Sequence, residues 1–228
     1  MKVFKILNLY ACLGGNRYKW DEVADAAGIK IQVTAVENDP ELARLYQERF
    51  PDDIVIVADA HQYLLDHYKE FDFIWSSINC PTHSRARFWS SSNYDSATLP
   101  VYPDMKLYEE IIFLMHYYKN GSWLVENVIP YYEPLIPAMK RGRHLYWSNL
   151  KLPESLNERN IQIGAGKNEV ERLSEFHDYD FRKYKGEQRI DKIARNLVDY
   201  EAGKTILECV LNIKPKSKLL MEDLFNFE

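Results

Sequence analysis

Short apolar runs alternate with stretches of helical periodicity over the first two thirds of the chain. Apolar or β-branched runs bounded by turn residues predict strands, whereas apolar residues spaced three and four apart predict helices. Asp39 followed by Pro40 is typical of a helix start, and Gly28 of a helix end. The expected strands are residues 4–9, 31–36, 54–57, 71–76 and 122–125, and the expected helices are 16–27, 39 onward, 61–68 and 105–118.

This alternation predicts an α/β fold of the Rossmann-like kind, with a mostly parallel sheet and helices on both faces. Sheets of this kind bind ligands at the carboxyl ends of their strands, near the point where the strand order reverses. The residues that directly follow each expected strand are therefore the candidates for chemistry.

Three segments depart from the alternation. Residues 83–104 are polar and rich in Ser, Arg, Asp and Pro, and a loop of this length is often a functional lid. Residues 150–186 are polar and irregular and indicate a small insertion, after which residues 190–213 return to helical periodicity. At 228 residues the whole chain, 1–228, is expected to form a single domain.

Charge and cysteine content limit the partners and the compartment. The formal net charge is -5, so any nucleic-acid-binding surface would be a local basic patch on an acidic molecule. Cys12, Cys80 and Cys209 lack metal-ligand spacing, and we expect no metal site. The N-terminal residues do not have the pattern of a signal peptide, and no apolar run is long enough to span a membrane. These features predict a reduced cytoplasmic protein.

The first expected strand leads into a tight turn at Gly14-Gly15, where the backbone could approach a ligand closely. Glu37 follows the second strand, where a carboxylate suits the hydroxyls of a ribose, and Asp59 follows the third, where it could accept from an adenine amino group. Each acid could instead cap a helix, and the glycines could form an ordinary turn. Together they outline a site for a nucleoside cofactor.

The fourth expected strand is followed by Cys80 in a polar and cationic stretch, where a reactive thiolate would be expected. The alternative is a buried structural cysteine, which fits Cys12 and Cys209 better because each lies in an apolar segment.

Two further polar groups follow the fifth strand. Glu126 should be partly buried, which would raise its pKa and allow it to donate to a ring nitrogen, although a salt bridge or a helix cap would also explain it. Arg141 and Arg143 stand one residue apart before a strand-like run, so both guanidinium groups are expected on one face, suited to an anion or a carbonyl. An exposed basic edge strand is the alternative.

In order along the chain, these motifs resemble those of the cytosine-5 DNA methyltransferases, and of short phage-like members in particular. The first motif of that family, Asp-x-Phe-x-Gly-x-Gly-Gly, is similar to residues 8–15, with Asn8, Tyr10 and Cys12 as departures. Cys80 stands at the family's Pro-Cys motif, although Asn79 replaces the proline. Glu37 and Asp59 stand where the family has its acidic residues for the cofactor's ribose and adenine. Residues Glu126 to Val128 are similar to its Glu-Asn-Val motif, Arg141 to Arg143 to its Arg-x-Arg motif, and Asn196 to Val198 to its late Asn-x-Val motif.

The resemblance implies an enzyme that uses S-adenosylmethionine and a covalent cysteine adduct. It assigns catalysis to Cys80, Glu126, Arg143 and Arg141. It assigns cofactor binding to Tyr10, Leu13, Gly14, Gly15, Glu37, Asp59, Asn196 and Val198. It assigns substrate binding to Ser84, Arg85, Arg87 and Asn127, with residues 83–104 as the mobile catalytic loop.

Target recognition is where the chain differs most from that family. Full-length members carry a sizeable recognition domain, in whose place this chain has only residues 150–186. Double-stranded DNA is favoured by the resemblance, while single-stranded DNA, RNA or a free nucleotide stay open, as does a partner chain that reads the sequence. A bacterial or phage-infected cell and a restriction-modification role are implied by the resemblance alone. A catalytically inactive binding homologue and an amino-nitrogen methyltransferase are the alternatives.

Overall fold

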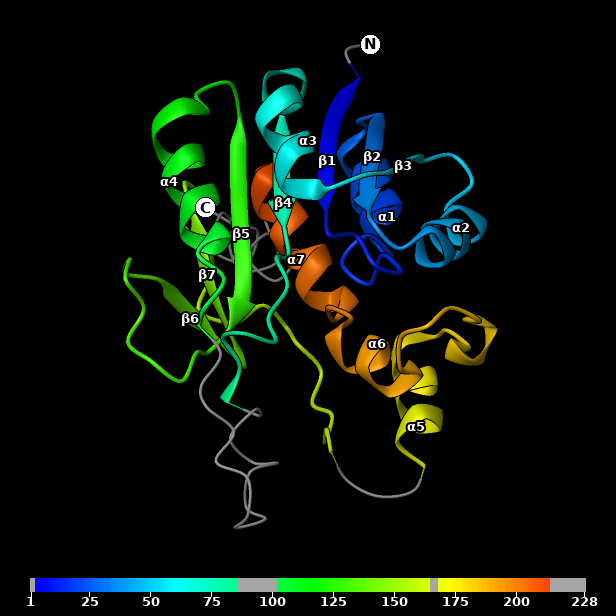
Figure 1. The fold of residues 1–228 in the computed structure, drawn as a ribbon. Helices are drawn as coiled ribbons and strands as arrows, with labels where there is room; N and C mark the ends of the chain where they lie inside the picture. The colour runs from blue at the N-terminus through cyan, green and yellow to red at the C-terminus, as the bar shows by residue number, and fades with distance from the viewer. Residues whose placement is uncertain (1–2, 86–101, 165–167, 214–228) are drawn as a thin grey trace, which may run out of the picture.

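The computed structural model describes residues 3–85, 102–164 and 168–213, and within them the backbone forms one seven-stranded sheet (Figure 1). The strand order is β3-β2-β1-β4-β5-β7-β6. The strands are β1 (Phe4–Leu9), β2 (Ile31–Glu37), β3 (Ile54–Val57), β4 (Phe73–Ser76), β5 (Ser122–Val128), β6 (Met139–Arg141) and β7 (His144–Ser148).

Strands β1 to β5 pair in parallel, and β7 pairs antiparallel with both β5 and β6. The order 3-2-1-4-5 is that of doubly wound nucleotide-binding sheets, whose strand order reverses between β1 and β4. The predicted Rossmann-like α/β fold is therefore confirmed, and the carboxyl ends of β1 and β4 lie where a ligand is expected.

Helices cover both faces of the sheet because alternate strand residues are apolar on each side. On one face Trp20 and Val23 of α1 and Ile206 of α7 pack on the strands, and on the other face Leu64 of α3 and Ile111 of α4 do so. The helices are α1 (Trp20–Ala27), α2 (Pro40–Arg49), α3 (Ala60–His67), α4 (Lys106–Tyr117), α5 (Glu169–His177), α6 (Ile190–Asn196) and α7 (Tyr200–Val210), with short 3-10 turns η1 (Tyr68–Glu70) and η3 (Phe181–Lys183).

Two expected helices differ from those observed. The first begins at Trp20, because residues 16–19 form the turn that leaves β1. Residues 190–213 form two helices, because the chain is extended at Leu197 and Asp199 then accepts a hydrogen bond from the backbone N–H of Glu201 at the start of α7. That break brings Leu197 and Val198 against the first turn of the sheet.

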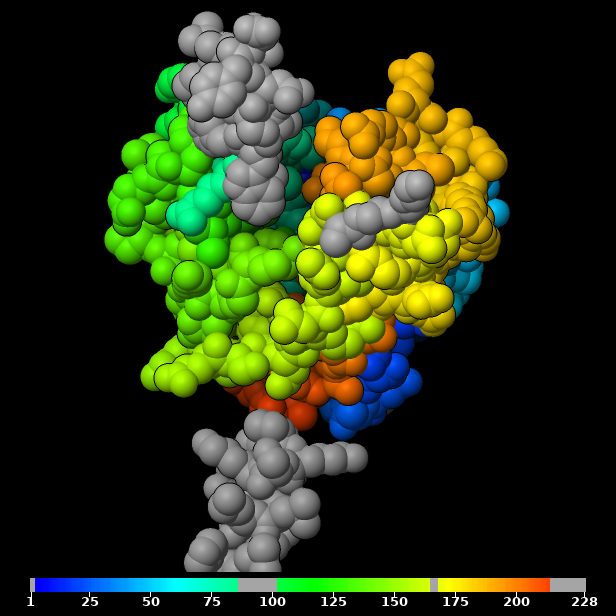
Figure 2. Space-filling model, turned by 90° about the horizontal axis from the view of Figure 1, so that it is seen from below, coloured from blue at the N-terminus to red at the C-terminus, as the bar shows by residue number. Residues whose placement is uncertain are grey.

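Helices α5 and α6 and the 3-10 turn η3 lie at the carboxyl end of the parallel strands, whereas α7 packs on one face of the sheet (Figure 1). Tyr184 and Gln188 each donate a hydrogen bond to Asp39 Oδ2, at 2.7 and 2.8 Å, which attaches this part to the start of α2. Figure 2 looks onto this end and shows a hollow between α6, in orange, and the green region of the chain. The expected loop 83–104 lies largely outside the described residues.

Candidate active site

A cavity of about 520 Å³ opens at the carboxyl ends of β1, β2, β4 and β5, a size typical of cofactor sites. It brings together residues from separate parts of the sequence, as the fold predicts. Of the predicted site residues, those that line it are Tyr10, Gly15, Glu37, Asp59, Cys80, Glu126, Asn127, Asn196 and Val198. Those described that do not line it are Leu13, Gly14, Ser84, Arg85, Arg141 and Arg143, and Arg87 lies outside the described residues.

The glycine turn after β1 is required by packing within the protein. Gly14 has a φ of +66°, and a Cβ there would lie 2.4 Å from the Phe50 ring and 2.7 Å from the Tyr46 ring. A Cβ on Gly15 would lie 2.3 Å from the carbonyl oxygen of Val198. Gly14 does not border the cavity, because the side on which a Cβ would stand is filled by aromatic rings of α2 and its C-terminal end, and its contact with the cofactor stays a prediction.

Leu13 likewise does not border the cavity. Its side chain is fully buried and packs with Leu42 and Leu45 of α2 and with Leu197. It helps to fix the turn but does not reach the cavity.

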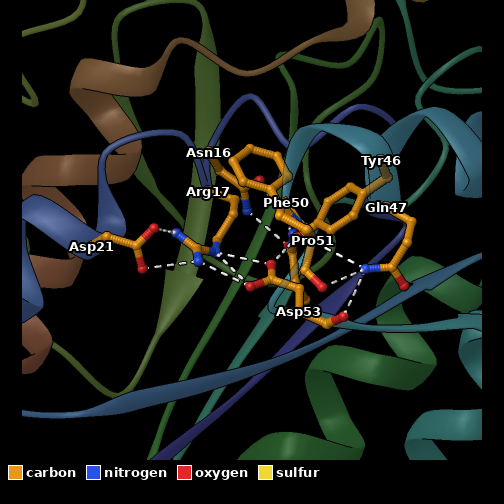
Figure 3. Close-up of polar contacts among 9 residues, drawn as sticks. Asn16, Arg17, Asp21, Tyr46, Gln47, Phe50, Pro51 and Asp53 are labelled. Atoms are coloured by element: carbon orange, nitrogen blue, oxygen red, sulfur yellow. Dashed lines mark hydrogen bonds and ion pairs between the residues drawn. The ribbon is translucent and has the colours of Figure 1, made fainter.

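A buried ion pair holds α2 against this turn (Figure 3). Arg17 donates from Nε and Nη2 to Asp53, with two of the contacts at 2.9 Å, and both side chains are at most 4% exposed. Tyr46 donates its hydroxyl hydrogen to the same carboxylate at 2.9 Å, and Asp21 accepts from the far side of the guanidinium. The pair fixes the ring of Tyr46 against Gly14, so the shape of the turn depends on this salt bridge.

Glu37 is buried at the end of β2 and holds the turn from the other side. Its Oε2 accepts from the backbone N–H of Cys12 at 2.9 Å, and its Oε1 accepts from that of Asp39 at 3.0 Å. Burial raises its pKa, while these hydrogen bonds to the charged form act against the rise. A carboxylate has about four acceptor positions, so Glu37 can accept further hydrogen bonds from a ligand.

Asp59 caps a helix, which is one of the two roles that the sequence left open. Its Oδ1 accepts from the backbone N–H of Gln62 at 2.9 Å and so caps α3, and this hydrogen bond lowers the pKa of the carboxyl. The side chain also borders the cavity, with Lys106 Nζ 3.6 Å from Oδ2. An ionised acceptor therefore stands at the edge of the cavity.

Tyr10 forms part of the cavity wall and is fixed by a buried carboxylate that the sequence analysis missed. It has a φ of 55°, and its hydroxyl donates to Glu110 Oε1 at 2.6 Å. Glu110, on α4, is fully buried and also accepts from Ser76 Oγ at 2.6 Å, while His61 Nδ1 lies 3.2 Å away. The aromatic position of the first motif is thus held rigidly by two helices.

Cys80 follows β4, and its thiol faces the cavity. Its Sγ lies 3.8 Å from Asn196 Oδ1, at the end of α6. Burial and then the nearby carboxyl of Glu126 raise the pKa of the thiol, while the charge of Lys192 lowers it. In this structure the thiol is therefore the resting form, which is contrary to the expected cationic environment.

Glu126 lies near the end of β5 and is 6% exposed. Among the described residues its Oε2 has no hydrogen-bond partner. Burial raises its pKa, as the sequence predicted. A buried carboxyl with an open oxygen facing a cavity is suited to bind a polar ligand group there.

The two arginines of the Arg-x-Arg motif do not share a strand, and the prediction of parallel guanidinium groups is wrong. Gly142 has a φ of +50° and turns the chain between β6 and β7, which is the usual use of glycine in a two-residue hairpin. Arg141 donates to the backbone carbonyls of Lys140, Leu152 and Pro153, and Arg143 is exposed at the turn.

The predicted substrate-binding residues mainly hold the Cys80 loop. Asn127 donates from Nδ2 to the Ile78 carbonyl at 3.1 Å, so its amide ties β5 to the strand end before Cys80. Ser84 pairs with Pro130, and Arg85 Nε donates to the Pro130 carbonyl at 2.9 Å. These side chains position the loop within the protein.

Several cavity residues were missed by the sequence analysis. Lys192 and Asn196 are four apart on α6 and so share one helix face, a spacing that could have identified Lys192. His144 directly follows the Arg-x-Arg motif, but only the hairpin shows which way it faces. The missed residues that line the cavity include Asn79, His144, Gln188, Lys192 and Arg195.

No metal-binding group of His, Cys, Asp or Glu side chains occurs within residues 3–85, 102–164 and 168–213. In the same ranges, none of the helices has the length and apolar character needed to cross a membrane.

No family model and no curated protein matches the chain. Among solved structures, the Spodoptera frugiperda DNMT2 mutant E260A/E261A/K263A is 23% identical, with a TM-score of 0.38, over 55% of this chain and 35% of that one. A candidate DNA modification methyltransferase from a prophage of E. coli is 16% identical, with a TM-score of 0.36, over 57% and 33%. A TehB-like SAM-dependent methyltransferase from Corynebacterium glutamicum is 17% identical, with a TM-score of 0.31, over 55% of each chain.

The matched region spans about a third of the first two of these structures. At these TM-scores the likeness assigns neither a reaction nor a substrate to this chain. The fold described above rests on the strand order and pairing of this chain alone.

Proposed function

We propose that this protein is an S-adenosylmethionine-dependent methyltransferase that methylates carbon 5 of cytosine in nucleic acid, with double-stranded DNA as the favoured substrate. One observation carries the proposal. Cys80 and Glu126, from the ends of two different strands, line one cavity whose other end is lined by Glu37 and Asp59. A nucleophile and a proton donor beside a nucleoside-shaped site is the arrangement that this reaction needs.

The residues present fit the cofactor. Glu37 would accept from the ribose hydroxyls with the lone pairs that the turn leaves open. Asp59, kept ionised by its capping hydrogen bond, would accept from the adenine amino group. The Tyr10 ring and Val198 would form the apolar walls. S-adenosylmethionine would supply an activated methyl group on its sulfonium.

The reaction that these residues support proceeds through a covalent adduct. The Cys80 thiolate forms a bond to carbon 6 of cytosine, and Glu126 donates its proton to ring nitrogen 3. Carbon 5, made nucleophilic in this way, would form a bond to the methyl group that the cofactor supplies, and the bond from that methyl group to sulfur would break. The carbon 5 proton then passes to water, nitrogen 3 returns its proton to Glu126, and the bond from carbon 6 to Cys80 breaks.

The electrostatics of the free protein suit the acid more than the nucleophile. Burial raises the pKa of Glu126 and so favours its protonated, donating form. The same burial raises the pKa of the Cys80 thiol. A cationic cofactor in the cavity would favour the thiolate, so the nucleophile would become active only when the cofactor is bound.

A duplex would have to release its target base into this cavity, at a cost of a few kcal/mol. The segment 150–186 contains one helix and one 3-10 turn within its described residues. The segment that recognises the base sequence would therefore be short, or a partner chain would supply it.

The proposal is tested with DNA that contains 5-fluorocytosine, since fluorine cannot leave carbon 5 as a proton does. Incubation with S-adenosylmethionine should give a species with the mass of protein plus DNA plus one methyl group. Cys80→Ala should abolish it. Asn79→Ala is the matched control, because Asn79 also borders the cavity and is the residue that an amino-nitrogen methyltransferase would use.

An adduct lost only in Cys80→Ala would support both the reaction and the nucleophile. If duplex DNA, single-stranded DNA and RNA all give no adduct while calorimetry shows cofactor binding, the cytosine-5 proposal is wrong. Methyl transfer that needs Asn79 but not Cys80 would assign the chain to amino-nitrogen chemistry.

A further inference from the structure

A second polar side chain, His144, stands beside Glu126 in the wall of the cavity. In the antiparallel pairing of β5 and β7, Glu126 lies opposite Tyr146 and Val128 lies opposite His144. Residues directly opposite one another in such a pair project from the same face of the sheet. His144 is therefore the diagonal neighbour of Glu126 on the face that borders the cavity.

A carboxylate from the segment 150–186 lies near the imidazole, whose buried Nδ1 has no hydrogen-bond partner among the described residues. Glu158 Oε1 lies 3.7 Å from His144 Nδ1 and accepts a hydrogen bond from the Tyr146 hydroxyl at 3.2 Å. A Cβ on Gly142 would lie 1.8 Å from Glu158 Oε2, so the carboxylate stands directly against the glycine of the hairpin turn. The side chains of His144 and Glu158 are 18% and 20% exposed.

The imidazole ring stands among charged groups. Glu158 faces it from the segment after β7, Glu126 stands beside it on β5, and Arg143 lies at the exposed turn. With Nδ1 directed at Glu158, the ring has Nε2 left for the cavity, where this nitrogen can donate a hydrogen bond when it carries a proton.

Arg143, by contrast, does not line the cavity. Its charge contributes to lowering the pKa of Glu126, but less than that of His144 does. The hairpin therefore presents histidine, rather than arginine, next to the buried acid.

We propose that His144, positioned by Glu158, is the base-contacting residue of the hairpin and donates Nε2–H to the ring carbonyl of the bound pyrimidine. This rests on the proposed function. Glu126 would then engage ring nitrogen 3, and His144 would engage the oxygen at position 2 on the same edge of the base. A hydrogen bond from a charged donor to a buried acceptor contributes about 1.5–3 kcal/mol, or roughly 10- to 100-fold in binding.

The test measures the rate of adduct formation on the 5-fluorocytosine DNA at increasing DNA concentration, with cofactor affinity and Tm measured on each variant. His144→Ala should raise the DNA concentration for half-maximal rate roughly tenfold or more. Cofactor affinity should stay within about twofold. His144→Gln, whose amide can donate the same hydrogen bond, should recover much of the binding.

Two further variants separate positioning from charge. Glu158→Gln should weaken DNA binding, since the carboxylate beside Nδ1 no longer holds the imidazole ring in place. Arg143→Ala, the neighbouring cation, should change DNA binding less than about threefold at moderate salt.

The outcomes distinguish this inference from the proposed function. If wild type forms the adduct and Arg143→Ala abolishes binding while His144→Ala does not weaken it, the inference is wrong and the reaction stands. His144→Ala could also lose DNA binding together with cofactor affinity or Tm, with no recovery in His144→Gln. That result would mean a structural role for His144 and would also overturn the inference. If wild type forms no adduct on any nucleic acid, the proposed function fails, and the inference fails with it.

Discussion

At the scale of single residues, burial shifts the protonation of Cys80 and Glu126, which line the same cavity, in the same direction. The Cys80 thiol and the Glu126 carboxyl both have raised pKa values, so both resist losing a proton. Under the proposed function, this favours the donating form of the acid and suppresses the reactive form of the nucleophile. The free protein therefore holds Cys80 as the thiol.

The raised pKa of the Cys80 thiol should determine the pH at which alkylating reagents modify it. Because its pKa is raised, the thiolate forms only at higher pH, and the rate of modification by iodoacetamide should reach its midpoint above the usual thiol value of about 8.5. Glu126→Gln removes a negative neighbour that raises this pKa, so the midpoint should move to lower pH. Peptide mass spectrometry across a pH series measures both. A midpoint at or below about 8.5 in wild type would contradict the burial described here.

At the scale of elements, the turn after β1 packs against both α2 and the extended residues before α7. The rings of Tyr46 and Phe50 fill the space beside Gly14, and the backbone of Val198 closes on Gly15. Arg17 and Asp53 hold this packing through a buried ion pair, and loss of one such partner costs about 3–5 kcal/mol because it leaves a buried charge unpaired. Gly14 and Gly15 are therefore required for the packing of neighbouring segments against this turn, whether or not a ligand is bound.

Gly14→Ala should destabilise the fold more than its backbone angle alone explains. Gly28 is the matched control, because its φ of +64° is close to the +66° of Gly14 while an added Cβ there meets nothing within 4 Å. Gly28→Ala should cost about 1–2 kcal/mol of unfolding free energy, from the left-handed angle alone. Gly14→Ala adds overlap with two rings and should cost about 1–3 kcal/mol more. Urea unfolding of both variants measures the difference, and equal losses would show that the rings move aside easily.

At the scale of the whole molecule, an acidic chain must hold its proposed polyanionic substrate with few cations. The formal net charge is -5, and Lys192 is an exposed cation at the cavity, on α6. Since each phosphate contact adds to the salt dependence of binding, a small number of contacts should give a shallow dependence.

DNA binding should therefore weaken only gently with salt, and Lys192 should account for part of the slope. Lys192→Ala is expected to reduce the slope of log K against log salt concentration by about 1. Lys69→Ala is the control, because this exposed lysine precedes β4 and so lies at the opposite end of the sheet. Fluorescence anisotropy over a salt series measures both slopes. Equal slopes in the Lys192 and Lys69 variants would show that α6 does not contact the backbone of the DNA.

The sequence by itself determined the parts of the fold that local physics controls. Apolar runs placed β1 and β3 at their observed bounds, and the Asp39-Pro40 pair placed the start of α2, because burial and capping leave direct marks on neighbouring residues. The burial of Glu126, and its raised pKa, could be predicted for the same reason, since a carboxyl near the end of a central strand is covered on both faces.

Only the tertiary structure decided how those marks combine. It showed that Gly142 turns the chain and parts Arg141 from Arg143, and that the open side of Gly14 is taken by rings of α2 and its C-terminal end. It also brought His144 to the cavity and Glu158 behind it. These contacts join residues far apart in sequence, and a linear pattern carries no information on which side chains fill a shared space.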